Sequence, residues 1–129
     1  MNIDRESLYA AALEARKNSY CPYSGYAVGA ALLAADGRVF LGANIENAAY
    51  SPTVCAERTA FAAAVSAGAR EFVAIAVVGG KKGGEPDPTR TPCGVCRQVM
   101  KEFCIPEFEI ILHGRTLTLA DLLPHAFEL

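Results

Sequence analysis

The spacing of apolar residues predicts an alternation of helices and strands along the chain. Near the N-terminus, apolar residues recur at positions i, i+3, i+4 and i+7, which predicts an amphipathic helix of about four turns. These residues are Leu8, Ala11, Ala12 and Ala15. The helix should end before Tyr20-Cys21-Pro22, because a residue preceding proline is disfavoured in the helical region. Residues 26–34 and 72–78 are almost continuously apolar, which is typical of strands buried on both faces.

Polar and glycine-rich segments predict the turns and loops between these elements. Asp36-Gly37 fits a two-residue hairpin turn that leads into a short strand at 39–41. Residues 44–50 follow neither a helical nor a strand period and predict a loop. Residues 79–91 are rich in glycine, proline and charge, so we expect a surface loop there, of open role.

Two helices are expected to begin at cysteine-containing sequences. The stretch 51–68 is rich in alanine, opens with Ser51-Pro52, a typical helix start, and closes at Gly68, a typical stop. The second helix should run over 93–103, with Pro92 near its first position. Both cysteine groups are therefore expected at helix N-termini.

The remaining elements complete an α/β fold. They are a strand at 108–112, a turn at His113-Gly114, a strand at 115–117 and a helix at 119–123, capped by Thr118 with Asp121. The order of elements implies one mixed sheet of about five strands with helices on both faces. A chain of 129 residues has the size of one domain, so we expect residues 1–129 to form a single domain.

Composition and charge exclude several classes of partner. The formal net charge is −2, so no basic field exists to hold a nucleic acid. The longest apolar run, 26–35, is far shorter than the roughly 20 residues that span a bilayer. The N-terminal sequence lacks the apolar core of a signal peptide. Five cysteines, an odd number, favour a reduced cytoplasmic protein that uses thiols for metal binding or catalysis.

The cysteine spacing predicts a zinc site. Cys93 and Cys96 are three residues apart on a first helical turn, so they share one face of the helix. Cys55 could supply a third thiolate from the other helix start, where the helix dipole favours the ionised thiol. Three protein ligands leave the fourth tetrahedral position for water, which is typical of a catalytic zinc.

Two residues beside Cys55 have chemistry that suits such a site. Glu57 follows Cys55 by two residues and can take a proton from the attacking water without binding the metal. Three thiolates would leave Zn²⁺ with a net charge of −1, which an arginine hydrogen-bonded to sulfur would offset. Arg58 and Arg97 are both candidates, and we favour Arg58 because it lies in the same turn as Cys55.

A CxxC pair alone is more often a structural zinc half-site or a redox pair. A structural site needs a fourth protein ligand, and the chain offers Cys21, Cys104, His113 and His125. Cys104 is expected at the far end of its helix, as a small buried apolar residue. A redox pair would leave Cys55-Ala56-Glu57 without an explanation.

The sequence CAERTA followed by PCGVCRQVM, with NIENAAYS just upstream, closely resembles the small, homotetrameric, three-cysteine cytidine deaminases. PYSGYAVGAAL near the start and DLLPHAF at the end extend the resemblance over nearly the whole chain. It implies a three-layer α-β-α cytidine-deaminase-like fold, one Zn²⁺ per chain held by Cys55, Cys93 and Cys96, and Glu57 as the catalytic acid and base.

The resemblance also implies a set of substrate contacts. Asn44 and Glu46 match residues that bind the ribose hydroxyls; without the resemblance, a polar loop that caps its own backbone would be the preferred interpretation. Ala56 would hold the edge of the base through its backbone. Tyr26 stands where the family commonly has a phenylalanine that stacks on the pyrimidine; the alternative is an ordinary strand aromatic. Its hydroxyl would need a partner.

Two aromatic residues imply contacts between subunits. Phe127 matches a C-terminal aromatic that reaches into a neighbouring subunit's site, although near a chain end it could also pack locally. Tyr50 matches a tyrosine at an intersubunit boundary. The resemblance thus implies a homotetramer with composite active sites.

The implied reaction is hydrolytic deamination of cytidine and deoxycytidine to uridine and deoxyuridine with release of ammonia, a step of pyrimidine salvage. The partner would be a small nucleoside, since the chain has no basic phosphate-binding stretch. The alternatives are blasticidin S deaminase, another zinc deaminase with the same core, or a structural zinc module that serves as a scaffold.

Overall fold

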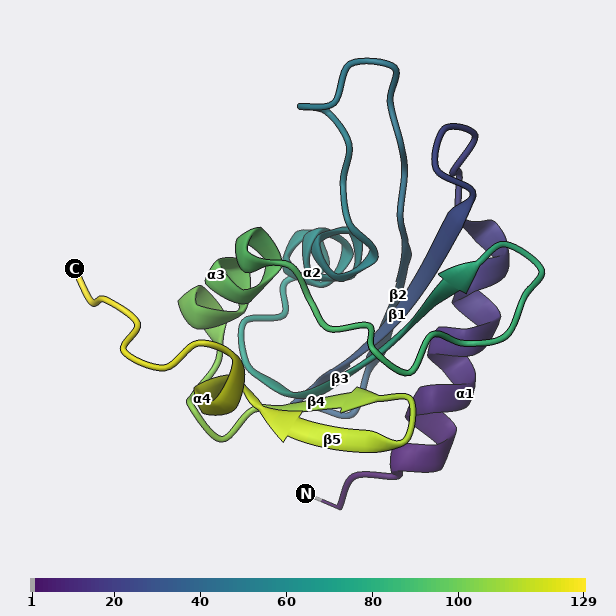
Figure 1. Cartoon of the computed structure of the whole chain (residues 1–129). Coiled ribbons are helices and arrows are strands. Elements are labelled where there is room, and N and C mark those ends of the chain that lie inside the picture. Colours follow the sequence, from purple (N-terminus) through teal and green to yellow (C-terminus); the bar gives the residue numbers. More distant parts are fainter. Residues whose placement is uncertain (1) are drawn as a thin grey trace.

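The computed structural model describes residues 2–129 as a five-stranded sheet with helices on both faces (Figure 1). The elements in chain order are α1 (Arg5–Ala15), the 3-10 turn η1 (Arg16–Asn18), β1 (Tyr26–Ala34), β2 (Val39–Ala43), α2 (Ala56–Ser66), β3 (Phe72–Lys81), α3 (Gly94–Phe103), β4 (Glu109–Leu112), β5 (Arg115–Thr118) and α4 (Leu119–Leu122). The predicted α/β class and the mixed five-stranded sheet are confirmed. None of the helices in residues 2–129 has the length and apolarity that a membrane crossing requires.

The strand order in the sheet is β2-β1-β3-β4-β5. β3 and β4 are parallel, because the chain crosses over through α3 between them, and the other neighbouring pairs are antiparallel. β1 and β3 are therefore inner strands, which explains why their sequences are almost continuously apolar.

The helices form one layer on each face of the sheet. α1 packs on one face, where Leu8 and Ala12 contact the side chains of Ala31 and its neighbours. α2 and α3 cover the other face around Phe61 and Met100 (Figure 1). The three-layer arrangement implied by the resemblance is therefore present.

The helix of the 51–68 stretch begins at Ala56, so the predicted start at Ser51-Pro52 is wrong. Ile45 and Val54 exchange two backbone hydrogen bonds of 3.0 Å, which hold Val54 in an extended conformation. The helix can begin only after this bridge. Its end is as predicted, because Gly68 has a φ of 94° and stops the helix two residues after Ser66.

Two other boundaries also differ from the prediction. β3 continues to Lys81, because its last residues pair with the start of β1, so Gly79 and Gly80 belong to the strand rather than to the loop. A Cβ on Gly80 would lie 2.6 Å from the carbonyl oxygen of Glu85, so glycine lets the following segment fold back onto the strand. The β1–β2 turn has three residues rather than two, since the amide of Ala34 bonds to the carbonyl of Arg38.

Candidate metal centre and active site

Two helix N-termini meet and bring together cysteines that are distant in the sequence. Cys55 is the N-cap of α2 and Cys93 is the N-cap of α3, both in extended backbone conformation. Cys96 follows one turn into α3 and is buried. The positive ends of two helix dipoles therefore face the three sulfur atoms and favour their ionised forms.

The three sulfur atoms have the spacing that a tetrahedral zinc ion requires. Sγ of Cys55 lies 3.7 Å from Sγ of Cys93, which lies 3.5 Å from Sγ of Cys96. Two thiolates bound to one zinc at about 2.3 Å would be about 3.8 Å apart. All three atoms lie within 4.8 Å of one another, so this cluster fits a metal ion.

Arg58 lies beside this cluster, one turn into α2. Its Nη2 donates to Sγ of Cys55 at 3.5 Å. The pKa of Cys55 is lowered to about 5, mainly by the neighbouring thiol of Cys96, with smaller contributions from Arg58 and Cys93. The pKa of Cys96 is raised in turn, mainly by the neighbouring Cys55. A divalent cation would allow all three thiols to ionise.

The other arginine candidate has a structural role. Arg97 donates to the carbonyl oxygens of Pro92 and Leu122, both at 2.7 Å, and so ties the start of α3 to α4. Arg58, not Arg97, therefore contacts a cysteine sulfur.

Among the residues that the structure describes, the group able to hold a metal contains these three cysteines alone. Cys21, Cys104, His113 and His125 are outside it. Cys104 is partly buried rather than fully buried as predicted, and desolvation raises the pKa of its thiol to about 12, which keeps it neutral. The absence of a fourth protein ligand among these residues argues against a closed structural zinc site.

Glu57 lies in the first turn of α2 and is completely buried. Neither of its carboxylate oxygens has a hydrogen-bond partner among the described residues. Desolvation raises the pKa of Glu57, while the nearby Arg90 opposes this increase. A buried carboxyl without partners is costly for the fold and is typical of a functional site.

Two residues of this region were not predicted from the sequence: Arg90, which lies beside Glu57, and Asp87, which contacts Tyr26. Arg90 lies with Nη2 at 3.6 Å from Oε2 of Glu57 and with its guanidinium carbon 5.8 Å from the centre of the Tyr26 ring. The hydroxyl of Tyr26 donates to Asp87 at 3.0 Å, so it has the partner that it needs. Arg90 and Asp87 lie in a loop whose composition gave no indication of a role in the site.

Asn44 and Glu46 use their side chains to fix the backbone around the start of β1. Oδ1 of Asn44 accepts from the amide of Val28 at 2.9 Å, and its Nδ2 donates to the carbonyl of Tyr26 at 2.9 Å. Oε1 of Glu46 accepts from the amides of Tyr23 and Ser24. These contacts show that both residues organise the polar loop. They leave one amide hydrogen of Asn44 and acceptor capacity on Glu46 for a ligand.

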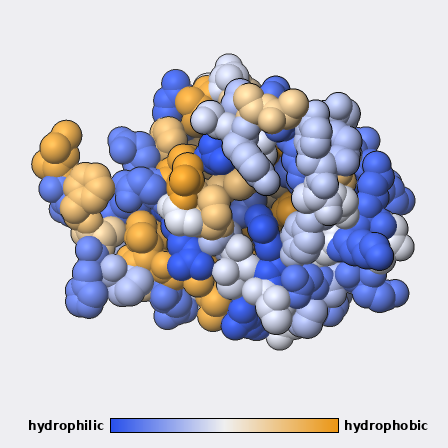
Figure 2. Space-filling view, turned by 45° about the horizontal axis from the view of Figure 1, so that its top comes forward, coloured by the Kyte–Doolittle hydropathy of each residue, from blue (hydrophilic) through white to orange (hydrophobic). Residues whose placement is uncertain are grey.

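The remaining predicted residues divide into one buried and two exposed positions. Ala56 is completely buried between Cys55 and Glu57. Tyr50 is 93% exposed, in the loop that leads to α2. Phe127 is 68% exposed, on a C-terminal segment that projects from the body of the molecule (Figure 1; Figure 2). Within one chain, neither aromatic residue is brought to the cysteine cluster.

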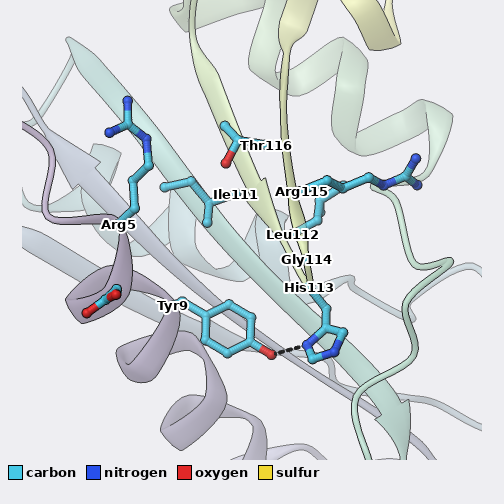
Figure 3. Close-up of a pocket in the computed structure, with 9 residues that line it drawn as sticks. Arg5, Tyr9, Ile111, Leu112, His113, Gly114, Arg115 and Thr116 are labelled. Atoms are coloured by element: carbon cyan, nitrogen blue, oxygen red, sulfur yellow. Dashed lines mark hydrogen bonds between the residues drawn. The ribbon is translucent and has the colours of Figure 1, made fainter.

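A groove of about 530 Å³ lies elsewhere, between α1 and the β4–β5 hairpin. Tyr9 and His113 form a hydrogen bond of 2.6 Å within it, and the side chains of Arg5 and Arg115 extend at its sides (Figure 3). None of the predicted site residues lines this groove. The residues predicted to carry the chemistry are therefore not in this groove, and the three cysteines among them form the cluster described above.

The fold and the cluster define a zinc-binding α/β protein with its metal centre at two helix N-termini. The chain belongs to the cytidine and deoxycytidylate deaminase family, since the model of the cytidine and deoxycytidylate deaminase zinc-binding region matches residues 2–112. Zinc is accordingly its cofactor, and the three-cysteine cluster is able to hold it.

The sequences of curated relatives align with almost the whole length of this chain. A cytidine deaminase of Sporosarcina psychrophila is 52% identical over 131 aligned positions, covering 98% of this chain and 93% of the relative. The crystal structure of cytidine deaminase from Burkholderia pseudomallei matches with a TM-score of 0.86 at 45% identity, covering 97% of this chain and all of the other. The structure of cytidine deaminase from Mycobacterium tuberculosis gives a TM-score of 0.88 at 42% identity, covering 99% and 100%.

Proposed function

We propose that this protein is a hydrolase that deaminates cytidine and deoxycytidine to uridine and deoxyuridine, with release of ammonia. The observation that carries the proposal is the buried carboxyl of Glu57, which has no hydrogen-bond partner among the described residues and lies two residues after Cys55 of the three-cysteine cluster. A metal site with three protein ligands and a free carboxyl at its side is suited to the hydrolysis of a carbon–nitrogen bond. Whole-chain relatives named cytidine deaminase support the same activity.

In this proposal, Cys55, Cys93 and Cys96 hold one zinc ion per chain, which supplies the electrophile that activates water. Glu57 would take one proton of the attacking water and deliver it to N3 while the remaining hydroxide adds to C4 of the base. It would then take the proton of the new C4 hydroxyl and give it to the amino group, so that the C4–N bond breaks, the C4 carbonyl forms and ammonia leaves. A raised pKa suits this exchange, because the carboxyl must both accept and donate a proton near neutral pH. Arg58 offsets the excess negative charge of the three thiolates.

We propose that Asn44 and Glu46 bind the ribose hydroxyls with the capacity that their backbone contacts leave free. Those contacts fix both side chains before the substrate arrives, which lowers the entropic cost of binding. The backbone of Ala56 would hold the edge of the base, and the ring of Tyr26 would stack on its face. Free cytosine would leave the ribose contacts unmatched and should be a poor substrate.

The proposed assembly is a homotetramer with composite active sites. Phe127 and Tyr50 are large, exposed aromatic side chains, and a wholly apolar hollow of about 280 Å³ lies over α2 and α3. Burial of these surfaces against other copies of the chain would be favourable. Phe127 would complete a neighbouring subunit's site. We also propose that residues 1–129 form one deaminase domain. The enzyme would act in pyrimidine salvage in the cytoplasm, a compartment in which five reduced thiols would persist.

The other readings are not favoured. Blasticidin S deaminase, or another zinc deaminase with this core, would share the metal cluster, but the whole-chain relatives are named cytidine deaminase. A structural zinc module requires a fourth protein ligand, which the described cluster does not contain.

The test is a substrate panel with purified, zinc-loaded protein, followed by ultraviolet absorbance. Cytidine, deoxycytidine, cytosine, cytidine monophosphate and blasticidin S are supplied separately. Loss of the amino group from the two nucleosides, with little from the others, is expected. Turnover of blasticidin S or the nucleotide in preference to the nucleosides would contradict the proposed substrate.

A further inference from the structure

The guanidinium of Arg90 lies between the two side chains that should contact the base of the substrate. Its Nη2 is 3.6 Å from Oε2 of Glu57, and its central carbon is 5.8 Å from the centre of the Tyr26 ring. A flat cation therefore occupies the space between the buried carboxyl and the aromatic ring.

The fold of residues 82–93, the segment before α3, places Arg90 at this position. The amide of Asp87 bonds to the carbonyl of Gly79 at 2.7 Å, and the carboxylate of Asp87 accepts from the hydroxyl of Tyr26. A Cβ on Gly79 would lie 3.0 Å from the Tyr26 ring and 3.1 Å from the Arg90 stem. The glycine thus leaves room for both side chains above the strand.

The contacts of Arg90 are weak enough for a ligand to displace its side chain. The distance to Glu57 exceeds that of a hydrogen bond, and Nε of Arg90 has no partner among the described residues. The side chain is 21% exposed, whereas Glu57 is completely buried, so Arg90 has a route to solvent that Glu57 lacks. A guanidinium also resembles the amino edge of a cytosine: it is planar, offers N–H donors to a carboxylate and stacks on aromatic rings.

We infer that Arg90 is an internal occupant of the base subsite, which pairs with Glu57 and covers Tyr26 until a nucleoside displaces it. The inference rests on the proposed function, because it takes the base-binding positions from there. The guanidinium and the base cannot both contact Glu57 and the same ring face. Arg90 therefore lowers the fraction of protein whose base subsite is open. A ligand binds only if the free energy of its own contacts exceeds the free energy needed to displace Arg90.

The experiment compares wild type with Arg90→Ala and Arg90→Gln, both as zinc-loaded protein. Calorimetry measures the Kd of uridine, the expected product, and steady-state kinetics give KM and kcat for cytidine. If about a tenth of the wild-type protein is open, both Kd and KM fall about tenfold in the alanine variant, with kcat unchanged. The glutamine variant, which keeps a polar side chain but is shorter and uncharged, should show the same direction if alanine impairs folding. Lys82→Ala, an exposed cation of the same segment, is the control and should change neither value.

Added guanidinium ion separates this role from a positioning role. At millimolar concentration it should refill the space in Arg90→Ala and raise KM for cytidine toward the wild-type value, with kcat unchanged. A rise in kcat instead, or an unchanged uridine Kd in both Arg90 variants of an active enzyme, would overturn the inference. Wild type that neither binds uridine nor converts cytidine would overturn the proposed function itself.

Discussion

Nη2 of Arg58 donates to Sγ of Cys55 at 3.5 Å, one helical turn away. The contact places a positive charge beside a cluster that becomes anionic when all three thiols ionise. Because hydrogen bonds to charged groups contribute about 1.5–3 kcal/mol, Arg58→Ala should lower kcat/KM roughly 10- to 100-fold. Stability in urea should change less, and Arg58→Lys should restore part of the activity. Equal losses of activity and stability would make Arg58 a structural residue.

The metal cluster predicts a sharp contrast between a cysteine inside α3 and the cysteine at its C-cap. Cys96→Ser should remove most of the bound zinc, measured by elemental analysis, and with it the activity and the stabilisation that zinc confers. Cys104→Ser is the matched control, because the neutral thiol of Cys104 lies outside the cluster. A chelator should lower the melting temperature of wild type and of the Cys104 variant, but not that of the Cys96 variant. Retention of stoichiometric zinc by Cys96→Ser would contradict the ligand set.

Glu57→Gln should keep the zinc and lose the activity. The amide has almost the same shape but cannot transfer a proton, and general acid–base catalysis contributes about 10²- to 10⁴-fold. The measurement is zinc content together with the rate of cytidine loss. Undiminished turnover would remove Glu57 from the proton transfers, and loss of zinc would mean that it supports the metal instead.

The same variant should change how stability depends on pH. The folded protein raises the pKa of Glu57, so above the ordinary pKa of a glutamate the unfolded chain ionises more readily than the folded one. Wild-type stability is therefore lost as pH rises from the ordinary value through the raised one, and the neutral glutamine of the variant is free of this penalty. The difference in unfolding free energy between Glu57→Gln and wild type should grow over the pH range that begins at 4.5, the ordinary pKa of a glutamate. A constant difference across that range would contradict a raised pKa.

The fold was predictable from sequence because its dominant signals are local. The apolar run of β1 and the glycine at position 68 were sufficient to locate a strand and a helix end. The start of α2 was not, because the bridge between Ile45 and Val54 joins two loop segments and overrides the preference of Ser51-Pro52 for a helix start. Helix and strand boundaries that depend on contacts between loops cannot be predicted from the periodicity of apolar residues.

The same distinction applies to the site. The cluster of Cys55, Cys93 and Cys96 was predictable because the spacing of these residues and their place at helix starts carry the chemistry. Arg90 was not found, because it reaches Glu57 only through the fold of its segment over Gly79 and Tyr26. The departure at Tyr26 did give one correct expectation, since a buried hydroxyl needs a partner and Asp87 supplies it.

If Phe127, on the exposed C-terminal segment, completes the active site of a neighbouring subunit, its removal should reduce activity. Phe127→Ala should lower kcat/KM by about 1–3 kcal/mol, the range found when a stacking aromatic is replaced by alanine. The loss should appear even though Phe127 is 68% exposed within its own chain. The melting temperature of the variant should stay close to that of wild type, because the side chain packs little within one chain.

Oligomers that contain two different variant chains test directly whether the active site is composite. Phe127→Ala chains have an intact cluster, and Glu57→Gln chains have an intact tail. Co-expression should therefore produce sites that combine a working Glu57 with a neighbour's Phe127. Activity per Phe127→Ala chain should rise above that of the pure variant, while wild type diluted with Glu57→Gln chains controls for assembly. Strict additivity of the two pure variants would mean that each chain uses only its own tail.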